Sequence, residues 1–201
     1  MEPVVSRAAA LLVGVCLGVP CQVIQFESNG LKYQTVTKRG VTLMVARLPG
    51  HVREFTILQV AFSNGSPGPY IVRPEDFSYV KDDGEELHAW PAADVVKLLR
   101  EKGGRSDVIK LVSAYETALY GIPHMRVANG YEARRQAAQA EVNSTKLRAA
   151  AAASAIALVQ TKLAPGESAD GAVFFGAEGK AFGAGKLIVR TNTDVFEFAA
   201  E

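Results

Sequence analysis

The sequence predicts a mainly β protein, an antiparallel β-sandwich that carries one inserted group of helices. Short runs with alternating apolar side chains fill residues 31–89 and return in residues 171–199, with turn residues about every ten positions. The residues between them, 91–162, follow the helical period instead. We therefore expect a single domain, residues 22–201, in which strands from both blocks share one core and the helices form an insertion.

The first block of strands follows the turn pair Asn29-Gly30. Alternation is clearest where Val41, Leu43 and Val45 fall on one face of a predicted strand. Pro, Gly and Asp-rich turns separate the segments. The predicted strands of this block are Leu31–Lys38, Val41–Leu48, Arg53–Ser63, Tyr70–Arg73, Phe77–Lys81 and Glu86–Ala89.

The second block begins after the turn at Pro165-Gly166. Its predicted strands are Gly171–Phe175, Gly185–Arg190 and Asp194–Ala199. Alternation assigns Val60, Phe62, Leu187, Phe196 and Phe198 to a common core, together with either Val173 or Phe174. Phe175 makes both faces of its strand apolar, so the choice between those two stays open. The solvent faces are expected to carry Lys32, Gln34, Gln59 and Arg190.

Three helices are predicted in the insertion, over Pro91–Gly103, Ser106–Tyr120 and Tyr131–Lys162. The third contains the unbroken alanine run Ala149–Ala153. Alanine favours helix and lets another helix approach closely, but it buries little area. The run therefore either docks a helix of another protein or packs against the first two helices of this chain.

Residues 1–21 have the pattern of a signal peptide. Arg7 supplies the basic region, Ala8–Val19 is a twelve-residue apolar core, and Pro20-Cys21 ends it. This core is too short to cross a bilayer about 30 Å thick. We expect export to the periplasm, the outer membrane or the medium. Cys21 is a candidate lipidation site, although Pro20 stands where such sites carry a small residue, and simple secretion is the alternative.

Composition excludes several functions. The formal net charge of +1 gives no field to attract nucleic acid. The two cysteines, Cys16 and Cys21, both lie in the leader, so no internal disulfide or thiolate metal site is expected after cleavage. Membrane association would come only through a lipid on Cys21.

No catalytic or cofactor motif is recognisable. The three histidines, His51, His88 and His124, are far apart, and no His-x-x-x-His or Cys-x-x-Cys pair occurs. The Gly179–Lys186 segment resembles a phosphate loop, but Leu187 replaces the required Ser or Thr. We expect no cofactor, no metal and no enzyme activity. The rival hypothesis is a hydrolase with a dispersed site around His88, Trp90 and Asp94.

Several segments together resemble a known class of domain. They are Phe55–Asn64, Phe77–Gly84, the Leu-x-Pro-Gly-Glu and Gly-x-Val-Phe-Phe pattern of Leu163–Phe175, and the closing Phe196-x-Phe198. The combination is similar to the immunoglobulin-like domains of uncharacterised bacterial envelope proteins and lipoproteins, in a variant with helices inserted before the Pro-Gly-Glu turn. The resemblance covers most of Leu31–Glu201 and implies an exported β-sandwich with no catalytic residues to carry over.

We therefore predict a non-catalytic exported binding or scaffold module of the bacterial cell envelope. The alternatives are an envelope hydrolase at the sandwich–helix junction and a lipid-tethered assembly factor. The insertion is the expected site for an envelope protein partner, since it concentrates residue types enriched at interfaces. These residues, which could instead only seal the helices onto the sandwich, are Trp90, Tyr115, Tyr120, His124, Met125, Arg126 and Tyr131.

Overall fold

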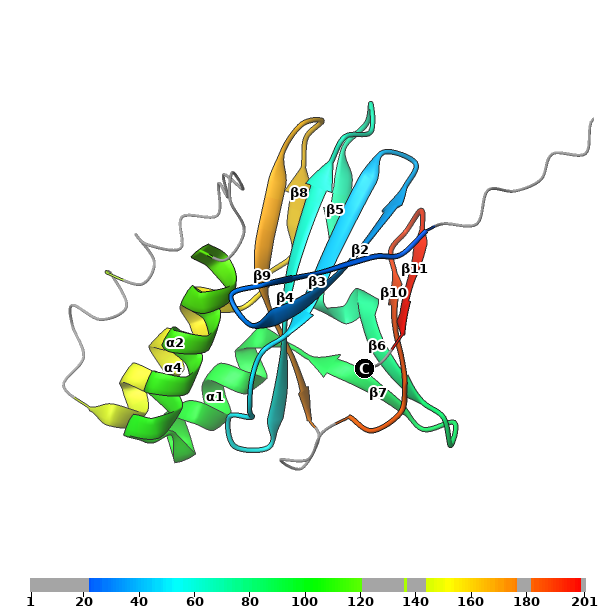
Figure 1. Cartoon of the computed structure of the whole chain (residues 1–201). Coiled ribbons are helices and arrows are strands. Elements are labelled where there is room, and N and C mark those ends of the chain that lie inside the picture. Colours follow the sequence, from blue (N-terminus) through cyan, green and yellow to red (C-terminus); the bar gives the residue numbers. More distant parts are fainter. Residues whose placement is uncertain (1–21, 121–135, 137–143, 177–181, 200–201) are drawn as a thin grey trace, which may run out of the picture.

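The computed structural model describes residues 22–120, 136, 144–176 and 182–199 (Figure 1). In chain order, strands come first, helices follow and strands return. The first group is β1 (Ile24–Ser28), β2 (Leu31–Lys38), β3 (Val41–Arg47), β4 (Phe55–Asn64), β5 (Tyr70–Val72), the 3-10 turn η1 (Pro74–Asp76), β6 (Phe77–Lys81) and β7 (Glu86–Trp90). The second is α1 (Ala92–Lys102), α2 (Arg105–Tyr120), α4 (Thr145–Ile156), β8 (Thr161–Leu163), β9 (Ser168–Gly176), β10 (Gly185–Arg190) and β11 (Val195–Ala199).

Most strands form one antiparallel sheet of nine, in the order β1-β2-β3-β4-β9-β7-β6-β10-β11. β5 and β8 form a separate pair. The two-residue turn between β1 and β2 has positive φ at both Asn29 and Gly30, as a type I′ hairpin requires. The C-terminal strands therefore share a sheet with the N-terminal ones, as the sequence predicted.

The sheet curls instead of dividing into two separately paired sheets. The joint is β7, which pairs with β6 through Glu86–His88 and with β9 only at Ala89↔Phe175 and Trp90↔Phe174. Beyond this short joint the sheet folds back over itself. As a result, β10 and β11 face β2 and β3 across a shared core (Figure 1). The protein is thus mainly β, with a large curled antiparallel sheet and a few helices.

The inner face of the curl holds the predicted core. Val60, Phe62, Leu187, Phe196 and Phe198 are all buried in one cluster. The sequence left open whether Val173 or Phe174 points into this core. Val173 and Phe175 point inward, whereas Phe174 points to the helices. Both faces of this strand are apolar because both are covered.

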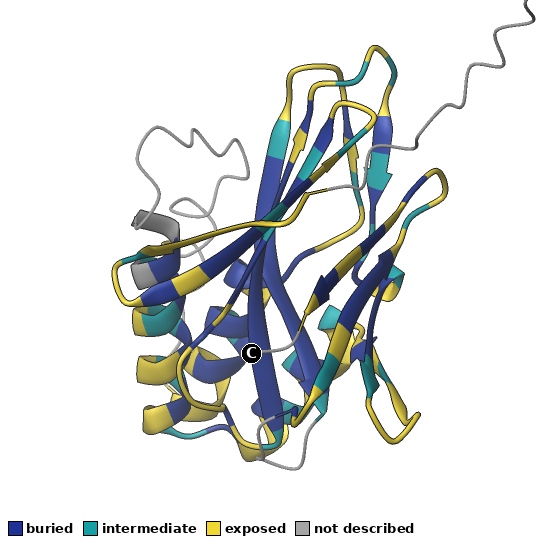
Figure 2. Ribbon diagram, turned by 45° about the vertical axis from the view of Figure 1, so that its right-hand side comes forward, coloured by how far each residue is buried: buried dark blue, intermediate teal, exposed yellow. Residues whose placement is uncertain are grey.

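The helices cover the outer face of β2, β3, β4 and β9 (Figure 2). Phe55 and Phe174 on the sheet meet Leu99 and Leu111 on α1 and α2, and all four are almost fully buried. The alanine run packs inside this layer, because α4 lies against both α1 and α2. The intramolecular interpretation of Ala149–Ala153 is therefore confirmed.

Because helices cover the outer face of the sheet, the expectation that Gln59 lies on a solvent face is wrong. Gln59, expected at the surface, is 2% exposed beneath the helices. Its amide nitrogen donates to the Asp170 carboxylate at 3.2 Å, and the Tyr115 hydroxyl also donates to Asp170. A polar residue on a buried face needs such partners, since an unpaired buried group costs about 1–3 kcal/mol.

The third helix is shorter than predicted. It ends at Ile156, and Thr161–Leu163 forms β8 instead of the last turn of a helix that reaches Lys162. The reason lies at Leu158, whose backbone N–H donates to the Ala172 carbonyl and whose side chain joins the inner core. Tertiary pairing with β9 therefore overrides a helical tendency that no Gly or Pro interrupts. β1 and β8 both lie outside the predicted strand blocks.

Gly171 is the position where this crossing is tightest, and it gives the first testable prediction. A Cβ at Gly171 would lie 2.6 Å from the Leu158 Cα and 2.7 Å from its backbone nitrogen. Because two backbone segments would have to separate, Gly171→Ala should lower the free energy of unfolding by about 1–3 kcal/mol. Urea denaturation monitored by circular dichroism measures this loss.

The matched control is Gly68→Ala, since a Cβ at Gly68 meets no atom within 4 Å. This change should alter stability by less than about 0.5 kcal/mol. Equal effects of the two substitutions would contradict the close approach of Leu158 to β9.

Candidate functional site

At one end of the curl, side-chain contacts join the end of β2 to the β10–β11 turn. The Lys38 ammonium donates to the Val195 carbonyl, and Arg39 forms an ion pair with the buried Asp194 at 3.2 Å. Asp194 also accepts from the Tyr70 hydroxyl at 3.3 Å. These links join strands that share no backbone ladder, and they leave the opposite end of the curl as the place for an opening.

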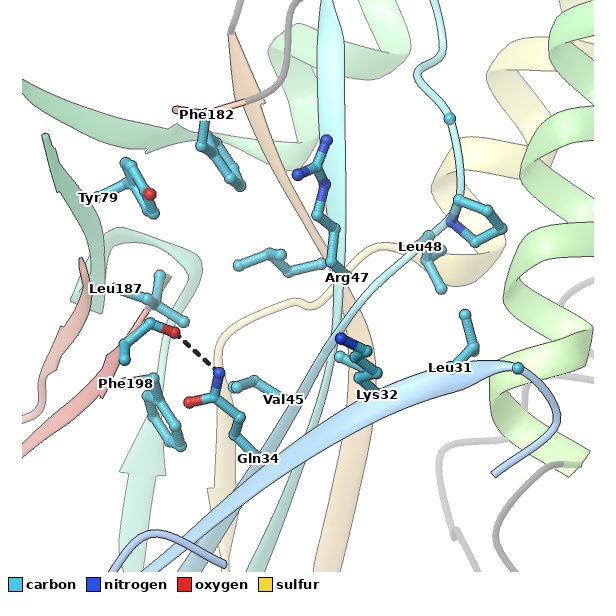
Figure 3. Close-up of a pocket in the computed structure, with 16 residues that line it drawn as sticks. Leu31, Lys32, Gln34, Val45, Arg47, Leu48, Tyr79, Phe182, Leu187 and Phe198 are labelled. Atoms are coloured by element: carbon cyan, nitrogen blue, oxygen red, sulfur yellow. Dashed lines mark hydrogen bonds between the residues drawn. The ribbon is translucent and has the colours of Figure 1, made fainter. Parts of the chain in front are cut away.

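A pocket of about 530 Å³ lies at that opposite end, between β2–β3 and β6–β10–β11 (Figure 3). This volume is within the range of small-molecule sites, roughly 300–1,000 Å³. Most of its wall is apolar and comes from strands distant in sequence. The apolar side chains are Val45, Leu58, Tyr79, Phe182, Leu187 and Phe198.

The polar part of the wall is basic. Arg47 and Lys32 line the pocket from β3 and β2, both residues are exposed, and no acidic residue is among the described residues that line it. In the part of the chain that the structure describes, Arg47 forms no ion pair. Its guanidinium instead lies 5.8 Å from the centre of the Phe182 ring. The pocket thus combines an apolar interior with positive charge at its mouth.

Gln34 links the two sides of the pocket. Its amide nitrogen donates to the Ala199 carbonyl at 2.8 Å, as the dashed line in Figure 3 marks. Its side-chain oxygen is buried and has no hydrogen-bond partner among the described residues. The residue is only 7% exposed, so the expectation that Gln34 lies on a solvent face is wrong.

Two stacked rings form another wall. Tyr79 and Phe182 lie parallel with ring centres 4.3 Å apart, and Phe182 also meets Phe175 edge-on at 5.2 Å. The Tyr79 hydroxyl donates to the Gly183 carbonyl at 2.8 Å. Burial raises the pKa of this hydroxyl and Asp82 adds to the rise, while Arg47 opposes it. Tyr79 is therefore neutral near pH 7 and serves as a fixed donor that holds Phe182 against the pocket.

Of the residues predicted as an interaction surface, the structure describes the side chains of Trp90 and Tyr115 alone. Tyr115 is a correction, because its side chain is fully buried between α2 and the sheet and its hydroxyl donates to Asp170. Trp90 is 36% exposed and meets Phe55 edge-on. The side chain of Tyr120, the residues His124, Met125, Arg126 and Tyr131, and the candidate lipidation site Cys21 lie outside the described residues.

The alternative catalytic group is not assembled either. A depression at the sheet–helix junction is lined by Trp90, but neither His88 nor Asp94 is among its described lining residues. His88 is exposed, and the described part of the chain gives it no hydrogen bond or ion pair. The serine opposite it on β6, Ser78, accepts instead from Arg190 at 2.8 Å. Among the described residues, no three His, Cys, Asp or Glu side chains gather to hold a metal ion.

Sequence reasoning missed the pocket, although a signal for part of it was present. Val41, Leu43 and Val45 share the inner face of β3, and Arg47 is the next residue on that face. A charged residue that continues an apolar face at a strand end indicates an opening in the core. The facing wall from β6 and β10 could not be found this way, because its register depends on tertiary pairing.

Comparison with known proteins identifies no relative: no family model, no curated protein and no solved structure matches the chain significantly. Within the described residues, no helix has the length and apolar character needed to cross a membrane.

The Tyr79 contact gives a second prediction. Tyr79→Phe removes the hydrogen bond to Gly183 and should lower the free energy of unfolding by about 0.5–1.5 kcal/mol. Tyr79→Leu should cost more, because it also removes the ring that stacks on Phe182. Urea denaturation compares the two variants. Equal losses would show that the ring contributes nothing beyond the hydroxyl.

Proposed function

We propose that this chain is a non-catalytic binding module of the bacterial cell envelope, with the pocket between β2–β3 and β6–β10–β11 as its ligand site. The pocket is the observation that carries the proposal. It has a mostly apolar wall with a small number of polar groups, which is the usual composition of small-molecule sites. Export is supported by the N-terminal pattern of Arg7, Ala8–Val19 and Cys21.

The immunoglobulin-like class is part of the same proposal. Two halves of the sheet, β2–β3–β4–β9 and β7–β6–β10–β11, face each other across one core, which supports a sandwich-like arrangement. In such a fold the strands supply a rigid frame and a ligand is held where the halves separate. The pocket occupies this position.

A second proposal is that the helical insertion binds an envelope protein, through fewer of the described residues than the sequence predicted. Trp90 is its best described candidate, since it is partly exposed beside α1. A partner there and a ligand in the pocket would use opposite faces of the sheet.

Filling the pocket tests the binding proposal. The mature protein should bind the neutral apolar dye N-phenyl-1-naphthylamine with a saturable rise in dye fluorescence. Val45→Phe adds bulk inside the pocket and should abolish this binding. Val159→Phe makes the same change at an exposed site, 49% accessible, and should leave it intact.

The outcome is interpreted with the folded state checked by circular dichroism. If the dye does not bind the wild-type protein, or if Val45→Phe and Val159→Phe bind it equally well, the pocket is not a ligand site. As a second readout, the dye should shift the methyl resonances of Val45, Leu58 and Leu187 together in the wild-type protein.

Export and tethering give a separate prediction. The intact mass of the mature protein recovered from cells should correspond to a chain that begins at or just after Cys21, and an added diacylglyceryl and acyl mass on Cys21 would establish the lipid anchor. An unmodified mass would support simple secretion. A mass that retains residues 1–20 would contradict export by a cleaved signal peptide.

A further inference from the structure

The charges around the pocket specify its ligand more closely than its volume does. This inference rests on the proposed function, since it concerns the same pocket. Arg47 and Lys32 line the mouth, and no carboxylate is among the described lining residues. Arg47 has no ion pair among the described residues, so a neutral apolar ligand would leave its charge uncompensated, and a cation would be repelled by it.

Two other side-chain donors of the wall are already engaged, whereas the Gln34 side-chain oxygen is an acceptor without a partner among the described residues. The Gln34 amide nitrogen donates to Ala199 and the Tyr79 hydroxyl donates to Gly183. Neither donor is available to a ligand anion without breaking a contact that holds the wall together. An anion in the pocket would therefore be met by Arg47, with Lys32 adding positive charge from the neighbouring strand.

Arg47 is oriented for this role. Its guanidinium lies over the Phe182 ring, 5.8 Å from the ring centre, a contact that holds the side chain against the pocket (Figure 3). The N–H groups of a guanidinium lie in its own plane, where they can bond a carboxylate through two parallel hydrogen bonds. The apolar floor behind it, formed by Val45, Leu58 and Leu187, would receive the rest of the ligand.

We propose that the pocket binds an amphipathic carboxylic acid, with its hydrocarbon body among Val45, Leu58, Leu187 and Phe198 and its carboxylate on Arg47. The acid is bound as an anion, since a carboxyl group with an ordinary pKa is ionised at neutral pH. The occupant is a single small molecule, because a pocket of about 530 Å³ is the size of a small-molecule site.

The experiment compares decanoate with 1-decanol, which share a ten-carbon chain and differ in the head group. Both should displace N-phenyl-1-naphthylamine from the full mature protein, below their aggregation limits. Decanoate should bind about tenfold more tightly, the factor expected for one charge-assisted hydrogen-bonded contact. Added salt should weaken decanoate binding and leave decanol binding unchanged.

Arg47→Gln should remove the tenfold preference by weakening decanoate alone. The matched control is Arg100→Gln, which removes the same charge from an exposed position on α1 and should change neither affinity. If decanol binds the wild-type protein as tightly as decanoate, or if Arg47→Gln leaves the preference intact, the carboxylate proposal is overturned and the binding module survives. If neither compound displaces the dye, and the dye itself does not bind, the proposed ligand site fails as well.

Discussion

Burial of both faces of the central strands β4 and β9 is the constraint on which the rest of the structure depends. A strand with Phe and Val on one face and Phe and Ile on the other must be covered twice. The returning strands β10 and β11 cover the inner face, and α1, α2 and α4 cover the outer face. The helices are therefore part of the core rather than an appendage. Polar groups on the covered face depend on partners within it, as the Gln59 amide nitrogen does on Asp170, while the Gln59 oxygen has no partner among the described residues.

Local patterns in the sequence predicted most of the fold. Alternation and turn residues located the strands that became β2, β3, β4, β6 and β10 to within a few residues, because each strand has at least one regular apolar face and is bounded by Gly, Pro or Asp. They predicted that the third helix ends at Lys162, whereas α4 ends at Ile156, since nothing in the local sequence marks Leu158 as a residue outside the helix. The local patterns also could not predict that the sheet curls, because the joint consists of only two residue pairs at the end of β7.

The candidate site was less predictable than the fold. Its walls come from β2, β3, β4, β6, β10 and β11, and no short motif spans them. Two residues singled out by type lie apart from the pocket: Tyr115 is in the core, and His88 has no hydrogen bond or ion pair among the described residues. The useful signal was instead a misfit between residue and face, with Arg47 and Gln34 continuing apolar rows. Such misfits point to an opening in the core, because a closed core would exclude these polar side chains.

The side-chain links between β2 and β11 also affect how the molecule behaves towards copies of itself. The last strand of a sheet normally offers its outward carbonyls to any extended chain nearby, and it can seed fibres. Here the side chains of Lys38 and Gln34 already donate hydrogen bonds to the carbonyls of Val195 and Ala199, at the two ends of β11. An incoming strand would have to displace both donors before it could pair along the edge. The closure of the curl thus also protects the protein against aggregation through this edge.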